Sequence, residues 1–528
     1  MRLPERSATL DSLTKRPAAD VLIVGGGING AGLLRELALN GVDALLVDQA
    51  DFSAGATSAS SRMIHGGLRY LENGEFRLVR ESLRERDRLL RLAPHAVRPL
   101  PTTIPIFSRW SGFGNATKRF LGLSTPPATR GAALIKVGLS LYDLLTARRR
   151  VLPPHHFTGR TAALRLRPQL HPGIVCTATY HDAQVALPER LCLELIADAC
   201  AAHPGSRALN YCALRRRDGS AVVLQDTVTG REYAVRPRVI VNATGGWIDL
   251  ANTALGAPTR WIGGTKGSHL VIEHPELMAA CRGEQLFYEN PDGRVCIFFP
   301  VNGRVLVGST DIRIDNPDAA VCDEREIDYM LESVRTVFPR LQLGREHIVS
   351  HFCGVRPLPA SADGFTGRIS RDHSCRTLPP GEDRPWPVHA MIGGKWTTFR
   401  AFAEQVADRI FTDLGRLRTA SSADRPIGGE ATPNAHAPGD LQAILRHEAV
   451  VHLDDLLLRR TPLGLYEIWT EERFTALARL AADALGWDAA RRTDEEARAR
   501  QILIQRHGVR LNPAPAQSPA SLHYVQRP

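Results

Sequence analysis

A polar loop followed by a pair of glycines is the segment of this chain best suited to chemistry. It runs from Ser58 to Glu72 and begins about ten residues after a βαβ dinucleotide-binding pattern ends. Within it, Gly66-Gly67 lies between His65 and Arg69. Glycine lets backbone approach a ligand closely, while His and Arg supply a titratable ring and a fixed cation. We expect this loop to form a wall beside a bound cofactor's reactive ring and its substrate.

The dinucleotide-binding pattern is complete. Val21-Leu-Ile-Val24 is an apolar run typical of a buried parallel strand, and Gly25, Gly27 and Gly30 follow it with G-x-G-x-x-G spacing. These glycines allow the tight turn, the approach to a pyrophosphate and the packing of helix on strand. A helix over 31–40 and a strand over 43–47 lead to Asp48, whose carboxylate is placed to accept hydrogen bonds from a ribose. The unit predicts a bound dinucleotide and leaves FAD and NAD as alternatives.

Composition bounds the class of protein. The 528 residues carry a net charge of +10, which fits an Arg-rich genome, an anionic substrate or an anionic membrane surface. The basic residues are scattered and match no nucleic-acid-binding motif, so we expect no nucleic-acid partner. Nine Cys without a C-x-x-C pair predict a reduced cytosolic protein with no metal site. No segment near the first residue pairs a basic region with an apolar core, so we expect no secretory signal.

Lysine is rare enough that its positions carry information. Only five of the 66 basic residues are Lys, and two of them, Lys266 and Lys395, lie in Gly-containing motifs. Chance placement is the alternative. A chain that uses Arg nearly everywhere keeps Lys where a compact ammonium with a tunable pKa matters, so both are candidates for a special role.

Eight motifs spread over nearly 400 residues resemble one family. From Asp20 to about Arg400 the chain resembles the FAD-dependent, quinone-linked glycerol-3-phosphate dehydrogenases of the D-amino-acid-oxidase-like superfamily. Trp396, where that family usually has Leu, is the departure able to reshape a pocket. The motifs are Gly25-Gly-Gly-Ile-Asn-Gly-Ala-Gly32, Ser60-Ser-Arg-Met-Ile-His-Gly-Gly-Leu-Arg-Tyr-Leu-Glu72, Glu75-Phe-Arg-Leu-Val79, Val241-Asn-Ala-Thr-Gly245, Lys266-Gly-Ser-His269, Gly308-Ser-Thr-Asp311, Gly354-Val-Arg-Pro-Leu358 and Gly393-Gly-Lys-Trp-Thr-Thr-Phe-Arg400.

The resemblance implies an α/β fold. It consists of a Rossmann-like FAD-binding domain of the glutathione-reductase type, an antiparallel-sheet substrate or cap domain, and a C-terminal helical domain. The FAD segments are expected at about 18–107, 176–260 and 351–420, and the cap segments at about 108–175 and 261–350. A linker over 421–439 then precedes the helical domain over 440–528, and residues 1–17 are expected to form a loose polar tail.

The resemblance also implies the site residues. Lys395 is the expected cation beside the flavin, where it raises the ring's electron affinity. Arg356 and Arg371, with Arg69 and Tyr70, are expected to bind the substrate, because a phosphate dianion calls for guanidinium donors. The expected FAD contacts are Gly25, Gly27, Gly30, Asp48, Ser60, Ser61, Arg62, His65, Gly66, Ala243, Thr244, Gly245, Gly394, Lys395 and Thr397.

The general base has two candidates. His269 is the first candidate to accept the proton of the substrate's C2 hydroxyl, with an ordinary pKa near ~6.5. His65 is the rival, although its neighbours Gly66 and Gly67 favour packing against the cofactor. A lone His in a globular protein is often structural, and that reading stays open for His269.

The expected activity is oxidation of sn-glycerol 3-phosphate to dihydroxyacetone phosphate, with two electrons passed through FAD to a quinone. An oxidase of the same fold that uses oxygen, a dehydrogenase for another hydroxy acid or amine, and a flavin-binding protein without turnover are the alternatives. The resemblance implies a cytoplasmic protein attached peripherally to the inner face of the cell membrane. The sequence leaves open whether the protein forms a homodimer.

One apolar run offers a route to that membrane. Residues 131–145 place Leu134, Val137, Gly138, Leu141 and Leu145 on one helical face, and basic residues precede and follow the run. It is too short and too charged to cross a bilayer, which needs ~20 apolar residues. It therefore suits a helix lying on an anionic surface or, alternatively, a cap helix packed on its own domain.

Overall fold

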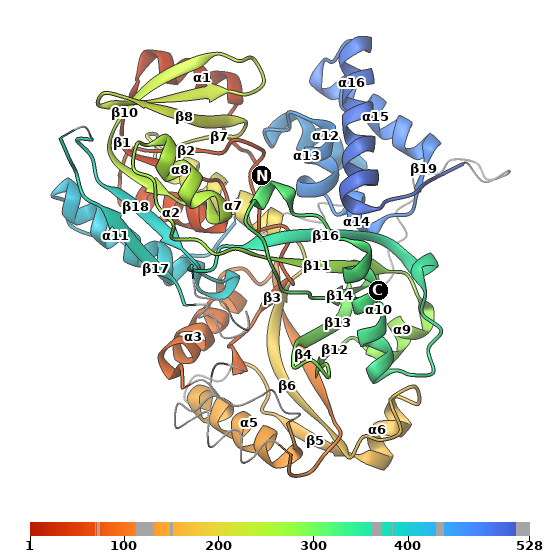
Figure 1. The fold of residues 1–528 in the computed structure, drawn as a ribbon. Coiled ribbons are helices and arrows are strands. Elements are labelled where there is room, and N and C mark those ends of the chain that lie inside the picture. The colour runs from red at the N-terminus through yellow and green to blue at the C-terminus, as the bar shows by residue number, and fades with distance from the viewer. Residues whose placement is uncertain are drawn as a thin grey trace.

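The computed structural model describes residues 1–68, 70, 74–111, 130–147, 151–360, 372–382, 384–428 and 438–513. Two large sheets lie side by side, and a group of helices from the C-terminal part of the chain lies against both (Figure 1). This is the expected mixed α/β class with a helical C-terminal region.

The first sheet forms around the apolar strand of the dinucleotide-binding pattern. Parallel strands run in the order β18, β10, β1, β2, β7, with β17 antiparallel at one edge and a β8–β9 meander continuing from β10. β1 is buried almost throughout, as expected for a strand covered on both faces. The bounds are β1 (Ala18–Val24), β2 (Ala44–Val47), β7 (Arg207–Leu209), β8 (Cys212–Asp218), β9 (Ala221–Asp226), β10 (Glu232–Asn242), β17 (Ser374–Leu378) and β18 (Val388–Ile392).

Three helices cover one face of this sheet. α2 (Ile28–Leu39) begins directly after the glycine turn and is buried over most of its length. It packs between α7 (Pro188–Ala202) and α11 (Phe399–Leu414), so segments from three distant parts of the sequence share one apolar core. α8 (Ile248–Ala254) follows β10. β18 pairs with β10 and α11 packs on α2, so the chain returns to the first sheet after residue 387.

The second sheet is mainly antiparallel, as expected for a substrate or cap domain. Its path is β15, β11, β14, β13, β12, β4, β6, β3, with β16 paired to β11 and β5 to β6; β4 and β12 run parallel. The chain enters this sheet with β3 and β4, which fall within the expected first FAD segment, 18–107. The expected domain boundaries stay a prediction. The bounds are β3 (Met63–Ile64), β4 (Val97–Ile106), β5 (His156–Gly159), β6 (Cys176–Val185), β11 (Thr265–Ile272), β12 (Gln285–Glu289), β13 (Val295–Val301), β14 (Arg304–Gly308), β15 (Ile312–Arg313) and β16 (Ile348–Arg356).

Helices pack around the second sheet. α3 (Phe76–Leu92) ends just before Pro94, and α5 (Ala132–Thr146) lies at the far end of the molecule from the C-terminal helices (Figure 1). Among the described residues no helix is long and apolar enough to span a membrane. The other helices here are α6 (Arg160–Leu166), α9 (Pro275–Cys281) and α10 (Glu324–Val337).

The C-terminal helices form a core of their own. Leu453, Leu456 and Phe474 are fully buried in it, together with residues from each of its longer helices. The bounds are α12 (Pro438–His447), α13 (Leu453–Asp455), a π-helical turn (Leu456–Arg460), α14 (Leu463–Tyr466), α15 (Glu471–Leu485), α16 (Ala489–Gln501) and a second π-helical turn (Ile502–Arg506), with a short β19 (Trp469–Thr470) paired to β20 (Leu511–Asn512).

The prediction of a loose N-terminal tail was wrong. Residues Arg6–Lys15 form helix α1, and Leu13 is buried against the first sheet. Arg6 forms an ion pair with Asp226 at 2.5 Å and also donates to the carbonyl oxygen of Tyr211. The segment is polar overall, which suggested a tail, but its few apolar residues and one buried ion pair fix it to the domain.

Leu13→Ala should therefore destabilise the protein by roughly 2–5 kcal/mol, the range for removing a buried leucine side chain. Leu417→Ala is the matched control, because Leu417 is 88% exposed and Leu13 is 2% exposed. Chemical denaturation of both variants measures the difference. Equal stability of the two variants would show that α1 does not contribute to the fold.

Candidate active site

The glycine turn at the end of β1 is shaped to hold a nucleotide. Gly25 adopts φ +112°, and a Cβ at this residue would lie 2.5 Å from the carbonyl oxygen of Ala243. A Cβ at Gly30 would overlap the carbonyl oxygen of Gly25. Asn29 Oδ1 is buried there without a hydrogen-bond partner among the described residues. The turn thus has the close backbone approach that a pyrophosphate site requires, at the first residues of α2. The Asn29 oxygen can accept a hydrogen bond from a ligand hydroxyl or N–H, but not from the pyrophosphate.

Asp48 stands at the carboxyl end of β2, beside this turn. Its side chain accepts hydrogen bonds from the amides of Gly26 at 2.7 Å and Ala50 at 2.9 Å. Burial raises the pKa of Asp48 to about 6, and these two amides oppose the shift. The residue lies where an open parallel sheet binds its ligand, outside the carboxyl ends of neighbouring strands.

The motif that ends β10 lies against the same turn. The amide of Ala243 donates to the carbonyl oxygen of Val24 at 2.8 Å, and Thr244 Oγ1 donates to Asn242 Oδ1 at 2.7 Å. Gly245 adopts φ +63°, where a side chain would be strained. The three expected contacts of this motif are therefore next to the glycine turn.

Two loops far apart in sequence form one wall. The amide of His65 donates to Thr397 Oγ1 at 3.1 Å, and that hydroxyl donates back to the His65 carbonyl oxygen at 3.2 Å. The amide of Gly66 donates to Asp182 Oδ1 at 3.0 Å and lies 3.1 Å from the hydroxyl of Tyr142. The predicted wall residues His65, Gly66 and Thr397 are thus brought together.

Lys395 projects from the second of these loops. Its Nζ donates to Ser82 Oγ at 2.8 Å and lies 4.4 Å from the centroid of the Tyr70 ring. Gly393 and Gly394 before it have φ +71° and +94°, so the turn that presents this lysine depends on glycine. The indole N–H of Trp396 donates to the carbonyl oxygen of Thr57 at 3.1 Å, so this side chain packs in the core of the first domain.

His269 lies in the middle of the second sheet, on β11. Its Nε2 is 2.8 Å from Ser61 Oγ, and its ring stacks on Phe352 at 5.0 Å. Burial, together with the charges of Arg356 and Arg62, lowers the pKa of His269 to about 3. The expected pKa near ~6.5 was wrong for this reason, and the imidazole is neutral at neutral pH.

Arg356 ends β16, which is paired to β11. Its guanidinium donates to Asp311 Oδ1 at 3.0 Å, Ser309 Oγ at 3.0 Å and the Thr310 carbonyl oxygen at 3.1 Å. Any Cβ at Gly267 would overlap this guanidinium, so the glycine makes room for it. The Arg356 side chain keeps 21% of its surface exposed, enough for a ligand to reach it.

Three further residues singled out from the sequence, Arg62, Ser60 and Lys266, bond to other residues of the protein. Arg62 is fully buried, and its guanidinium bonds to Glu189 at 3.2 Å and to the Ala186 carbonyl oxygen at 2.7 Å. Ser60 Oγ accepts the backbone amide of Arg62 at 3.3 Å. Lys266 is engaged by Asp323 and Glu326, so its role is to fix α10 to β11. The predicted substrate residues Arg69 and Arg371 lie outside the described residues.

Sequence reasoning missed four residues that build the wall. Ser82, Asp182, Tyr142 and Asp311 each bond directly to a predicted site residue. Asp311 ends a motif that was recognised, which was a usable signal. The other three lie on separate elements, and nothing local in the sequence marks them.

The first domain has a glycine turn, a ribose-side acid and Lys395 on the loop before α11, and the second sheet carries His269 and Arg356 on paired strands. These are features of a dinucleotide-dependent oxidoreductase. The family model described as FAD dependent oxidoreductase matches residues 20–409, and the chain belongs to that family. Its cofactor is FAD, whose nucleotide the glycine turn and the Asp48 carboxylate fit.

Several relatives of the chain are named as dehydrogenases of phosphorylated alcohols. The chain is 36% identical to a glycerol-3-phosphate dehydrogenase of Synechocystis over 79% of this chain and 74% of that one. It is 32% identical to the aerobic glycerol-3-phosphate dehydrogenase of Escherichia coli over 74% and 73%. It is also 32% identical to a D-erythritol 1-phosphate dehydrogenase of Brucella abortus over 79% and 78%. A FAD-bound glycerol-3-phosphate dehydrogenase from Bacillus halodurans shares the fold, with TM-score 0.71 and 20% identity over 95% and 97% of the two chains.

The lowered pKa of His269 predicts a pH effect on stability. Between pH 6.5 and about 3 the unfolded chain binds a proton on this residue that the folded protein does not, so stability falls as pH falls through this window. From pH 7 to pH 5 the wild type should lose about 2 kcal/mol through this group, and His269→Gln should lack that loss. Melting curves of both proteins at the two pH values measure the effect, and equal pH dependence would contradict it.

Proposed function

We propose that the protein oxidises sn-glycerol 3-phosphate to dihydroxyacetone phosphate and passes the electrons from FAD to a membrane quinone. The observation that carries the proposal is the placement of Arg356 and His269 on the paired strands β16 and β11, close enough for the arginine to lower the pKa of the histidine. An anion anchor and a proton acceptor on one rigid sheet match a phosphorylated alcohol. The relatives named above support the same substrate class.

Each side chain has a distinct part in the proposed reaction. Arg356 binds the phosphate, for which its planar fork is suited. His269 accepts the proton of the C2 hydroxyl at Nε2, with Ser61 Oγ 2.8 Å away to orient or relay it. FAD, when bound, supplies the hydride acceptor. Lys395 places a cation on the wall beside it, and Ser82 orients that cation.

Anaerobic titration of the purified, FAD-loaded protein tests the substrate. Glycerol 3-phosphate should bleach the flavin absorbance faster than glycerol, lactate or a D-amino acid, because only a phosphorylated alcohol meets both Arg356 and His269. D-Erythritol 1-phosphate is the informative competitor, since it carries the same two groups on a longer chain. Faster bleaching by a D-amino acid would refute the proposal, and faster bleaching by the erythritol phosphate would move the substrate to a longer polyol.

The phosphate anchor has its own test. Arg356→Ala should lower kcat/KM for glycerol 3-phosphate by roughly 2–4 kcal/mol in transition-state terms, the scale for losing one partner of a buried charged hydrogen bond. FAD content should not change, because the guanidinium contacts the 309–311 loop and the histidine side of the site. Arg345→Ala is the control, since Arg345 pairs with Glu324 and Asp328 on exposed surface. Loss of FAD from the Arg356 variant would make this residue structural.

The proposed quinone acceptor requires a membrane contact, and α5 supplies a candidate surface. Its inner face, Ile135, Leu139 and Tyr142, is buried in the cap core. Its outer face leaves Val137 58% and Leu144 70% exposed, and Leu145 is exposed as well. Trp110 is also exposed and belongs to the segment whose carbonyl oxygens accept the first amides of this helix. Of the expected stripe, Val137 and Leu145 are exposed, whereas Leu134, Gly138 and Leu141 are half-buried and Leu141 packs against the cap core. The basic residues 118–119 and 148–150 that bracket the helix lie outside the described residues.

The outer face of α5 should bind anionic vesicles. Val137→Ser with Leu144→Ser should reduce flotation with such vesicles, because each exposed apolar side chain contributes about 1–3 kcal/mol when it leaves water. Leu250→Ser is the control, because Leu250 is exposed on α8 in the other domain. Flotation that both variants leave unchanged would place the membrane contact elsewhere, and no flotation of the wild type at low salt would refute peripheral attachment.

A further inference from the structure

The loop that follows Asp48 connects the nucleotide site to the C-terminal helices. Asp48 bonds through its side chain to the amides of Gly26 and Ala50, and the amide of Ser53 donates to the Gly26 carbonyl oxygen at 3.1 Å. The loop 48–53 therefore lies directly on the glycine turn. Any shift of this loop moves both the ribose-side carboxylate and the backbone that faces the pyrophosphate.

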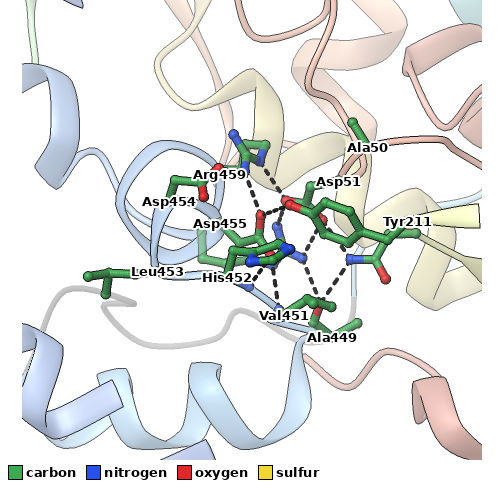
Figure 2. A network of polar contacts seen from close by, with 12 residues as sticks. Ala50, Asp51, Tyr211, Ala449, Val451, His452, Leu453, Asp454, Asp455 and Arg459 are labelled. Carbon is green, nitrogen blue, oxygen red and sulfur yellow. Dashed lines mark hydrogen bonds and ion pairs between the residues drawn. The ribbon is translucent and has the colours of Figure 1, made fainter. Parts of the chain in front are cut away.

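Asp51, in the middle of this loop, is held by two arginines from the far end of the chain. Its carboxylate accepts a hydrogen bond from Arg459 at 2.6 Å (Figure 2). It also accepts two hydrogen bonds from Arg460, at 2.5 and 2.9 Å. Asn210 Nδ2 donates to the same carboxylate at 2.8 Å. The Asp51 side chain is completely buried, as is that of Arg460.

The two arginines are fixed in turn by the C-terminal region. Arg459 also bonds to Asp455 at 2.5 Å and to Asp454 at 2.8 Å, on the helix just before it. The hydroxyl of Tyr211 donates to Asp455 at 2.6 Å, so the first domain contributes a second contact to the same cluster (Figure 2). Burial alone would raise the pKa of Asp51, but Arg460 and Arg459 outweigh burial and lower it, so the carboxylate is ionised.

The buried ion pairs of Asp51 with Arg459 and Arg460 hold the loop and the C-terminal helices together. Removing one partner would leave an uncompensated charge away from water, which strongly destabilises this contact. The family model ends at residue 409, so Arg459 and Arg460 lie outside the part of the chain that it matches. The loop beside the ribose-side acid is thus held by residues that the family's FAD-binding core does not include.

We propose that docking of the C-terminal helices through Arg459 and Arg460 onto Asp51 positions the loop 48–53 and thereby sets the affinity for FAD. By thermodynamic reciprocity, FAD strengthens the docking of the C-terminal helices by the same factor. Asp51, Arg459 and Arg460 are positioning residues in this scheme, since they act through Asp48 and Gly26. The inference rests on FAD as the cofactor and not on the proposed substrate.

FAD titration of the apoprotein, followed by flavin fluorescence in the absence of any substrate, tests the proposal. Asp51→Asn and Arg460→Met should each weaken FAD binding by a factor of about 5 to 150, the usual range of coupling between two sites. The double variant should lose less than the product of the two, because both changes break the same pair. Arg190→Met is the matched control: it breaks the Arg190–Glu448 pair, which joins α7 to the C-terminal region without a bond to the loop. Glu448 meets Arg460 only through its backbone carbonyl oxygen, which this change leaves in place.

Hydrogen exchange gives a second reading, and in the unaltered protein this reading does not depend on whether the variants fold. FAD should slow amide exchange over 453–466, and Arg190→Met should keep this effect while Asp51→Asn loses it. A folded Asp51→Asn protein with wild-type FAD affinity would overturn the proposal, as would exchange over 453–466 that FAD leaves unchanged. Equal weakening of FAD binding by Arg190→Met would overturn the assignment to Asp51. None of these readings depends on turnover of glycerol 3-phosphate.

Discussion

Arginine–carboxylate pairs shielded from water hold the cofactor wall together. Arg86 bonds to Asp182 at 3.0 Å, and the same carboxylate receives the amide of Gly66 and the hydroxyl of Tyr142. Arg400 bonds to Glu85 at 2.7 and 3.0 Å. Water does not screen these pairs, so each one has to be geometrically complete to offset the cost of burying its charges. The guanidinium fork suits this better than an ammonium, which fits a chain that uses Arg almost everywhere.

Helix α3 shows how one element gathers these pairs. Ser82, Glu85 and Arg86 occupy positions i, i+3 and i+4, so they share one helical face, and all three are buried. They bond respectively to Lys395, Arg400 and Asp182. One inward polar face thus connects the loop that presents the lysine, the helix α11 that follows this loop, and the strand β6 that supports Gly66. Charged residues of this helix thus serve to join elements of the fold and are not all exposed to solvent.

How far the sequence predicts the structure follows from how local each signal is. The turn from Gly25 to Gly30, the acid at Asp48 and the strands on either side are encoded within thirty residues, and they lie as predicted. The wall residue His65 was singled out from the residue types around Gly66 and Gly67, whereas Thr397 was found only because it falls in a motif of a recognised family. Their contact spans 332 residues, and no local pattern encodes such a contact. Asp51 was missed for the same reason, because its partners lie 408 and 409 residues away.

Electrostatics was the least predictable part of the site, and it bears most on the proposed chemistry. The type of residue at His269 indicated a base with an ordinary pKa, but burial beside Arg356 and Arg62 lowers that pKa to about 3. Such a histidine is neutral but too weak a base for an alcohol. Under the proposed function, a phosphate dianion on Arg356 offsets one of the two neighbouring cations, so binding of this substrate removes part of the pKa shift, while burial, its largest cause, remains. An alcohol without the phosphate would leave the whole shift in place. Binding of the non-reacting phosphate and the proton affinity of His269 are therefore coupled through one guanidinium.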